Sequence, residues 1–152
     1  MKEIHSLILI AALAFFYHYS NRSNTTPFNK IMYTQHKIIA DTLKNKGIGS
    51  FKEIRLDSEI NEALAKEGQY TYEAKCSACH KINKSFVGPA LKGIFEKRSP
   101  EWIMNMILNP EEMMQQDSTA MALQEEYHGI PMPNQELTTE EARAILEYFR
   151  TL

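Results

Sequence analysis

Residues Cys76-Ser77-Ala78-Cys79-His80 decide what kind of protein this chain can be, because they contain both of its cysteines. No cysteine remains for a disulfide elsewhere in the chain. A four-ligand zinc site built from two Cys-x-x-Cys pairs is also excluded, because the second pair is missing. The function of this one motif is therefore the main question that the sequence poses.

Three interpretations of the motif remain: covalent attachment of a c-type haem, a thioredoxin-like redox pair, and two buried thiols placed together by chance. Thiols three positions apart lie close to one helical turn apart, so they can reach the two vinyl groups on one edge of a porphyrin. His80 then follows as a ligand for the iron. A thioredoxin-like pair should follow a strand, whereas residues 59–75 have a helical pattern. The motif therefore favours haem attachment.

Length and composition describe an ordinary globular chain. Its 152 residues suit one domain, and 43% hydrophobic with 24% charged residues excludes disorder across the whole chain. Lys and Arg number 17 against 19 Asp and Glu, a net charge of -2. Nucleic-acid binders are usually strongly basic, so we expect no nucleic-acid partner.

An apolar run, Leu7–Tyr17, lies near the amino terminus. It is shorter than the ~20 residues that span a bilayer, and its length suits the apolar region of a signal peptide. We predict that residues 1–20 are a signal peptide or an N-terminal membrane anchor, with a buried core helix as the alternative. In bacteria haem is attached to this motif outside the cytoplasm, so export and the motif support each other.

The remaining chain divides into a linker or N-terminal extension, residues 21–58, and a domain, residues 59–152. Patterns of apolar residues and caps predict a short helix over 31–46, a helix from about 59 to 75 capped by Asp57 or Ser58, and a helix started by Ser99-Pro100 and stopped at Asn109-Pro110. One more short helix is predicted over 111–127, and a last one capped by Thr138 or Thr139. No strong strand pattern is present, so the predicted class is all-α.

Taken in order, these pieces resemble the class I c-type cytochromes over about residues 60–150. A helix with Gly68 and Tyr72 precedes CSACH; Val87-Gly88-Pro89 follows, then a helix with Trp102, a Pro-Met-Pro loop and an amphipathic last helix. The sequence around the motif is similar to that of exported single-haem cytochromes of flavobacterial relatives. The resemblance implies about four or five helices wrapped around one covalently attached haem, with Gly68 and Tyr72 crossing Ile145 and Tyr148.

The resemblance also implies roles for particular residues. Cys76 and Cys79 would form thioether bonds to haem c, and His80 would bind the iron. The carbonyl of Pro89 would accept a hydrogen bond from the second ring nitrogen of His80, unless Pro89 is only a turn residue. Trp102 would pack on the haem edge, or would be an ordinary core residue.

The sixth iron ligand has several candidates among the eight methionines. Met132 lies between two prolines just before the last helix, where the family has its axial methionine. Met121 and His128 are the alternatives. Met106 is expected in the core, and Met113 and Met114 lie in a stretch rich in Glu and Gln.

The charge is unevenly distributed. Residues 75–98 contain six basic side chains and one acid, a net charge of +5, so the rest of the chain carries -7. A basic surface around the haem edge would attract an acidic partner, although it could equally be a solvated loop.

The function implied is a one-electron carrier and not an enzyme, with His/Met-ligated haem, working in the periplasm. Its donor would be a quinol-oxidising complex and its acceptor a terminal reductase or oxidase. The protein would be soluble after cleavage or anchored to the inner membrane. The alternative is a haem protein with an open or labile sixth site, a gas sensor or a catalytic haem.

Overall fold

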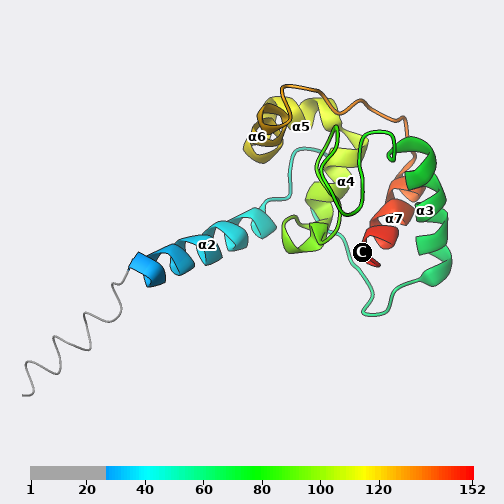
Figure 1. The fold of residues 1–152 in the computed structure, drawn as a ribbon. Coiled ribbons are helices and arrows are strands. Elements are labelled where there is room, and N and C mark those ends of the chain that lie inside the picture. Colours follow the sequence, from blue (N-terminus) through cyan, green and yellow to red (C-terminus); the bar gives the residue numbers. More distant parts are fainter. Residues whose placement is uncertain (1–26) are drawn as a thin grey trace, which may run out of the picture. The chain divides into compact units, whose positions relative to one another are not determined.

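The computed structural model describes residues 27–152, which contain helices and no strand (Figure 1). The chain divides into two compact units, Met1–Ile38 and Ile39–Leu152. The predicted signal or anchor segment, residues 1–20, lies outside the described residues. The helices are α2 (Pro27–Lys44), α3 (Glu62–Lys75), the short 3₁₀ helix η1 (Ile94–Glu96), α4 (Pro100–Leu108), α5 (Pro110–Gln116), α6 (Ser118–Glu126) and α7 (Thr139–Phe149).

Helices α3 and α7 cross at close range, as the sequence predicted, and lie side by side in Figure 1. Gly68 is buried at the crossing, where a Cβ atom would lie 1.9 Å from the carbonyl oxygen of Ala144 and 2.7 Å from the nitrogen of Ile145. One turn later, the rings of Tyr72 and Tyr148 lie 5.5 Å apart. Only glycine permits this approach, which brings the end of α3 against the core face of α7.

Two of the predicted helix starts are confirmed. Ser99 caps α4 by accepting a hydrogen bond from the Trp102 N–H, with Pro100 in the first turn. Thr138 and Glu141 form a reciprocal capping box at the start of α7.

The start of α3 is a correction. Asn61, and not Asp57 or Ser58, caps the helix, because its side-chain oxygen accepts a hydrogen bond from the Leu64 N–H. The carbonyl groups of Asp57 and Ser58 instead accept hydrogen bonds from Arg150, the C-cap residue of α7. A tertiary contact therefore keeps these residues out of the helix.

The single helix predicted over 111–127 is also wrong, because the chain forms α5 and α6 with a break at Asp117. Asp117 has extended backbone angles, and its side chain accepts a hydrogen bond from the Ala120 N–H as the cap of α6. The same carboxylate accepts a 3.0 Å hydrogen bond from the Trp102 indole nitrogen. A buried side-chain contact therefore sets the break.

The segment between α2 and α3, whose packing the sequence left open, is held by buried polar groups of α4. Glu101 accepts a hydrogen bond from the Ile54 N–H and forms a 2.7 Å ion pair with Lys46. The Asn105 amide donates to the carbonyl groups of Lys46 and Phe51. These bonds satisfy the backbone of a segment without regular structure.

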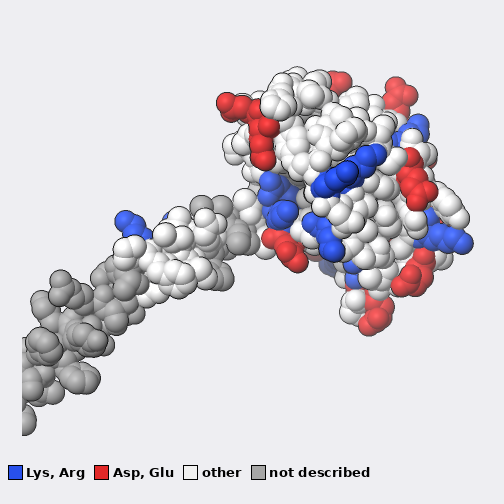
Figure 2. Space-filling model, in the orientation of Figure 1, with Lys and Arg blue, Asp and Glu red and all other residues white. Residues whose placement is uncertain are grey.

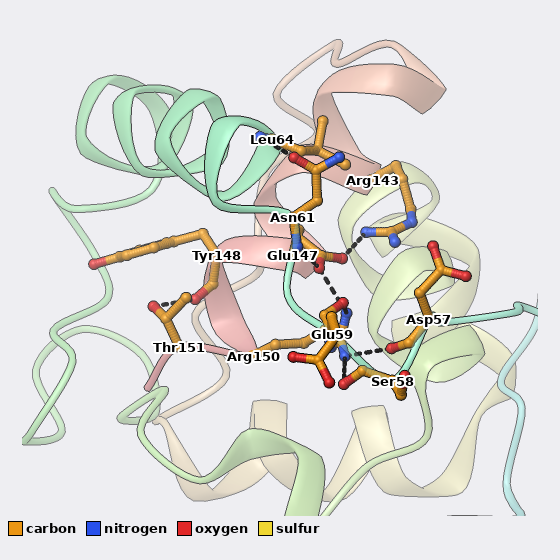
Figure 3. A network of polar contacts seen from close by, with 10 residues as sticks. All are labelled: Asp57, Ser58, Glu59, Asn61, Leu64, Arg143, Glu147, Tyr148, Arg150 and Thr151. Atoms are coloured by element: carbon orange, nitrogen blue, oxygen red, sulfur yellow. Dashed lines mark hydrogen bonds and ion pairs between the residues drawn. The ribbon is translucent and has the colours of Figure 1, made fainter.

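A second polar network, centred on Glu147 of α7, holds the start of α3 (Figure 3). The carboxylate is 1% exposed, accepts a 2.9 Å hydrogen bond from the Asn61 N–H, and forms 2.6 Å ion pairs with Arg143 and Arg150. Burial alone would raise the pKa of Glu147. The hydrogen bonds from Asn61 and Arg143, and the two positive charges, outweigh burial and lower this pKa below its ordinary value.

The Glu147 network predicts a pH-dependent contribution to stability. Glu147→Gln keeps an acceptor for Asn61 but leaves two guanidinium groups without their counter-charge, so we expect a loss of about 3 kcal/mol in the free energy of unfolding at neutral pH. Because folding lowers the pKa of Glu147, its stabilising effect is complete above the unfolded value and is lost as pH falls through the folded value. Denaturant titrations followed by far-ultraviolet circular dichroism at several pH values measure this.

The matched control is Glu53→Gln, which removes the carboxylate of an exposed ion pair with Arg55. This variant should lose no more than about 0.5 kcal/mol. A Glu147→Gln difference from wild type that does not shrink in acid would contradict the role of the charge.

Candidate functional site

A cavity of about 520 Å³ opens within the unit Ile39–Leu152. Its size is that of a cofactor site, and most of its lining is apolar. It brings together residues that are far apart in the sequence, from the end of α3, from α4, α5 and α6, from α7 and from the connecting loops. All six residues predicted for the site line it: Cys76, Cys79, His80, Pro89, Trp102 and Met132.

The two cysteines lie on a turn that continues from α3. The Cys76 N–H bonds to the Tyr72 carbonyl, and the N–H groups of Cys79 and His80 both bond to the Cys76 carbonyl, at 3.1 and 2.9 Å. The two side chains therefore have the near-helical spacing that the motif predicted. Neither cysteine forms a disulfide.

The environment of Cys76 is unlike that of a reactive thiol. Burial, assisted by the neighbouring Cys79, raises the pKa of Cys76 to about 11. Catalytic and redox-active cysteines have lowered pKa values. Residues 27–152 also contain no strand on which a thioredoxin-like motif could be built. Both observations speak against thiol–disulfide chemistry.

The imidazole of His80 is oriented by its surroundings. Its Nδ1 lies 3.0 Å from the carbonyl oxygen of Pro89. A carbonyl oxygen can only accept, so Nδ1 is the donor in this contact, and Nε2 is the ring nitrogen left to face a metal. Gly88 lies against the ring, since a Cβ there would be 2.5 Å from its Cε1 atom. The Tyr72 hydroxyl donates a 2.7 Å hydrogen bond to the His80 carbonyl, which fixes the backbone as well.

Met132 is half-buried and lines the same cavity, in the loop before α7. The two alternatives named from the sequence are not among the lining residues. Met121 lies on α6 with 48% of its surface exposed, and His128 is exposed in a turn. The structure therefore brings together Met132 and the pentapeptide, and not either alternative.

Two further methionines line the cavity, which sequence reasoning missed. Met106 of α4 and Met114 of α5 both contribute to the wall. Met113 points elsewhere and is completely buried. Helical spacing predicted that Met106 lies in the core. The acidic and amide neighbours of Met114 gave no indication that Met114 lines a cavity.

Trp102 belongs to the core, and its position also leaves the predicted packing on a haem edge open. It is 4% exposed as part of the core and it also lines the cavity. Its indole N–H is satisfied by Asp117, so only its apolar surface faces the cavity wall.

Arg98 is a cavity residue that the sequence indicated only as one of several basic side chains. Its guanidinium carbon lies 5.1 Å from the centre of the Trp102 ring. Burial lowers the pKa of Arg98, opposed by the charges of Asp117 and Glu126. Its Nε atom is buried and has no hydrogen-bond partner among the described residues. A bound group with a carboxylate would satisfy this donor.

These features together fit a haem. The wall is apolar, two thiols stand at one edge, and an imidazole nitrogen with a free lone pair and a thioether are available for iron. The unsatisfied Nε donor of Arg98 suits one of the propionate groups that a haem carries. The chemistry of the donor set thus agrees with the motif.

Comparisons with known proteins agree with this site. The family model described as cytochrome c matches residues 65–152. Cytochrome c-551 of Stutzerimonas stutzeri is 32% identical over 98 residues, which cover 61% of this chain and 84% of that protein.

Solved structures are similar as well. Cytochrome c from Rhodothermus marinus is 38% identical, with a TM-score of 0.66 over 75% of this chain and 92% of that one. An engineered form of it, bound to a carbene intermediate, is 37% identical, with a TM-score of 0.63 over 75% and 93%. The family binds haem c covalently, and this chain has the two cysteines of the motif at positions 76 and 79. The chain belongs to the cytochrome c family and is a class I c-type cytochrome, a haem-based electron carrier.

Proposed function

We propose that this cytochrome is a one-electron carrier with a single haem attached through Cys76 and Cys79 and bound axially by His80 and Met132. The observation that supports it best is the cavity itself. One apolar space is lined by both thiols, by an imidazole whose Nδ1 is engaged by Pro89, and by the thioether of Met132.

When bound, the haem supplies an iron centre that takes up and releases one electron. The chain's own residues hold and tune it. The Pro89 carbonyl fixes the ring of His80 and makes its Nε2 a better electron donor by accepting a hydrogen bond from Nδ1–H. Trp102 and the aliphatic lining would keep water away from the haem. A dry site favours the ferrous state, in which the haem carries less positive charge. If His80 and Met132 both hold the iron, no position would remain on it for a substrate, so we propose that the protein is not an enzyme.

The alternative is an open or labile sixth site, which would make the protein a gas sensor or a catalytic haem. The engineered Rhodothermus marinus protein with its carbene intermediate shows that a related site can hold a reactive group after engineering. Binding of a small ligand to the reduced protein separates the two functions.

The first test concerns Met132. Reduced wild-type holoprotein should show an unchanged low-spin visible spectrum when carbon monoxide is added. Met132→Ala should bind carbon monoxide, because the substitution removes the thioether. Met121→Ala is the matched control, since Met121 is exposed and outside the cavity lining, and it should behave as wild type.

Three results would contradict the proposal. Carbon monoxide binding by the wild type would favour the alternative function. Opening of the site by Met121→Ala, or by His128→Ala, would assign the sixth ligand elsewhere.

We propose further that the basic segment, residues 75–98, receives acidic redox partners. Figure 2 shows basic side chains near the middle of the displayed face of the Ile39–Leu152 unit and acidic ones mainly around its edge. Lys75 and Lys97 are exposed and also line the cavity, so positive charge stands beside the site. By the family resemblance, we propose a quinol-oxidising complex as donor and a terminal reductase or oxidase as acceptor.

A charge reversal tests the basic segment. Lys97→Glu should slow oxidation of the ferrous holoprotein by ferricyanide roughly three- to tenfold at low salt, because it replaces attraction of the anion with repulsion. The same variant should speed oxidation by the cationic tris(phenanthroline)cobalt(III) ion. Stopped-flow absorbance gives both rates, and the differences should vanish as ionic strength rises.

Lys66→Glu is the control, because it makes the same change in net charge at an exposed position of α3 outside the cavity lining. Equal effects of the two variants would mean that net charge alone matters. That result would contradict a specific basic docking surface.

We also propose export to the periplasm, directed by residues 1–20, with the mature protein either released or tethered to the inner membrane. No helix within residues 27–152 is long and apolar enough to cross a bilayer. The exposed Phe28 and Ile31 of α2, with Lys30 and Lys37 on another side of the helix, are typical of a segment that lies at a membrane surface, which supports a tether.

Cell fractionation tests this location. Covalent haem, stained after denaturing electrophoresis, should be found in the osmotic-shock fluid or in the inner membrane. N-terminal sequencing of the haem-stained band then decides between cleavage and tethering. A haem-stained band confined to the cytoplasm would contradict the proposed export.

A further inference from the structure

The loop that carries Met132 has few backbone hydrogen-bond donors. Pro131 and Pro133 have no N–H group, so Met132 is the sole backbone donor in this tripeptide. Its N–H points at the sulfur of Met114, with the nitrogen and Sδ 3.3 Å apart. Thioethers are weak acceptors, yet this bond joins the loop to a helix 18 residues earlier in the chain.

Helix α5, which presents Met114, is itself held in place. The adjacent Met113 is fully buried, and its sulfur accepts a 3.0 Å hydrogen bond from the Ile48 N–H. A Cβ at Gly47 would lie 2.7 Å from that sulfur, so the packing there is tight. At the other end of α5, Asp117 is bonded to Trp102. Met114 therefore projects into the cavity from a helix fixed on two sides.

Neighbouring contacts of the loop do not replace this bond. The N–H groups of Gly129 and Ile130 bond to nearby carbonyl groups of residues 124 and 127, and Gln135 bonds to Pro133 within the loop itself. These contacts shape the loop but do not join Met132 to the cavity wall.

We propose that Met114 is a positioning residue for the sixth iron ligand: its thioether accepts the Met132 N–H and thereby limits release of Met132 from the iron. This inference rests on the proposed axial role of Met132. In this proposal the thioether of Met132 binds the iron and that of Met114 does not. By restraining the Met132 backbone, Met114 keeps the thioether of Met132 within reach of the metal after each thermal displacement.

Met114→Leu removes the acceptor and nearly keeps the volume. Met106→Leu is the matched control, because Met106 also lines the cavity but its sulfur accepts no hydrogen bond from the described residues. Met114→Gln restores an acceptor, its side-chain carbonyl, on a chain of similar length.

The experiment mixes the full-length ferric holoprotein with saturating imidazole in a stopped-flow instrument, so that the observed rate is limited by release of Met132. Met114→Leu should be roughly two- to threefold faster than wild type, as loss of one weak hydrogen bond at the low end of the usual range implies. Met106→Leu should stay near the wild-type rate, and Met114→Gln should return most of the way to it. Thermal midpoints should be alike for the two leucine variants.

The inference is overturned if Met114→Leu and Met106→Leu accelerate imidazole binding equally, or if Met114→Gln is as fast as Met114→Leu. Carbon monoxide separates these failures from failure of the proposed function. If Met132→Ala opens the reduced site and the wild type stays closed, Met132 keeps its axial role and only the role of Met114 falls. If the reduced wild type already binds carbon monoxide, the axial role of Met132 falls, and the inference with it.

Discussion

The close crossing of α3 and α7 is the constraint on which the site depends. Gly68 allows the backbone of α3 to rest against the carbonyl group of Ala144, and this fixes the direction in which α3 ends. The motif follows directly, because Cys76 is the C-cap residue of α3. The crossing therefore aims the cysteines and His80 at the cavity before any contact with a cofactor is made.

Buried polar groups hold the connecting segments of the domain in place, as a disulfide or a larger apolar core does in other proteins. Glu147 joins the start of α3 to α7, and Glu101 and Asn105 join the irregular segment before α3 to α4. Each of these side chains satisfies backbone groups that lack a helical partner. With much of the interior given over to the cavity, such directional bonds hold the long connections at defined places.

Methionine has three different uses in and beside the cavity wall. Met132 offers a thioether in a loop stiffened by two prolines, Met106 fills apolar wall, and Met113 and Met114 accept backbone hydrogen bonds on different sides of α5. The flexible side chain and polarisable sulfur suit all three. The methionine sulfur atoms thus serve as filler and as hydrogen-bond acceptor, and in the proposed function as an iron ligand.

The sequence by itself determined the features that depend on local chemistry. The spacing of Cys76, Cys79 and His80 indicated the cofactor, and the caps at Ser99 and Thr138 marked helix starts, because each relies on residues within one turn of the chain. Family resemblance added Met132, whose loop lies far along the chain from the motif, and the structure brings both to one cavity.

Only the tertiary structure decided the features that depend on distant partners. Asp117 breaks the predicted helix because it bonds to Trp102, and Asp57 stays outside α3 because its carbonyl bonds to Arg150. Arg98 looked like one more basic side chain until its buried, unpartnered Nε was seen beside the cavity. In each case, folding brings together groups from separate segments, and a pattern read along one segment does not contain the partner that changes its role.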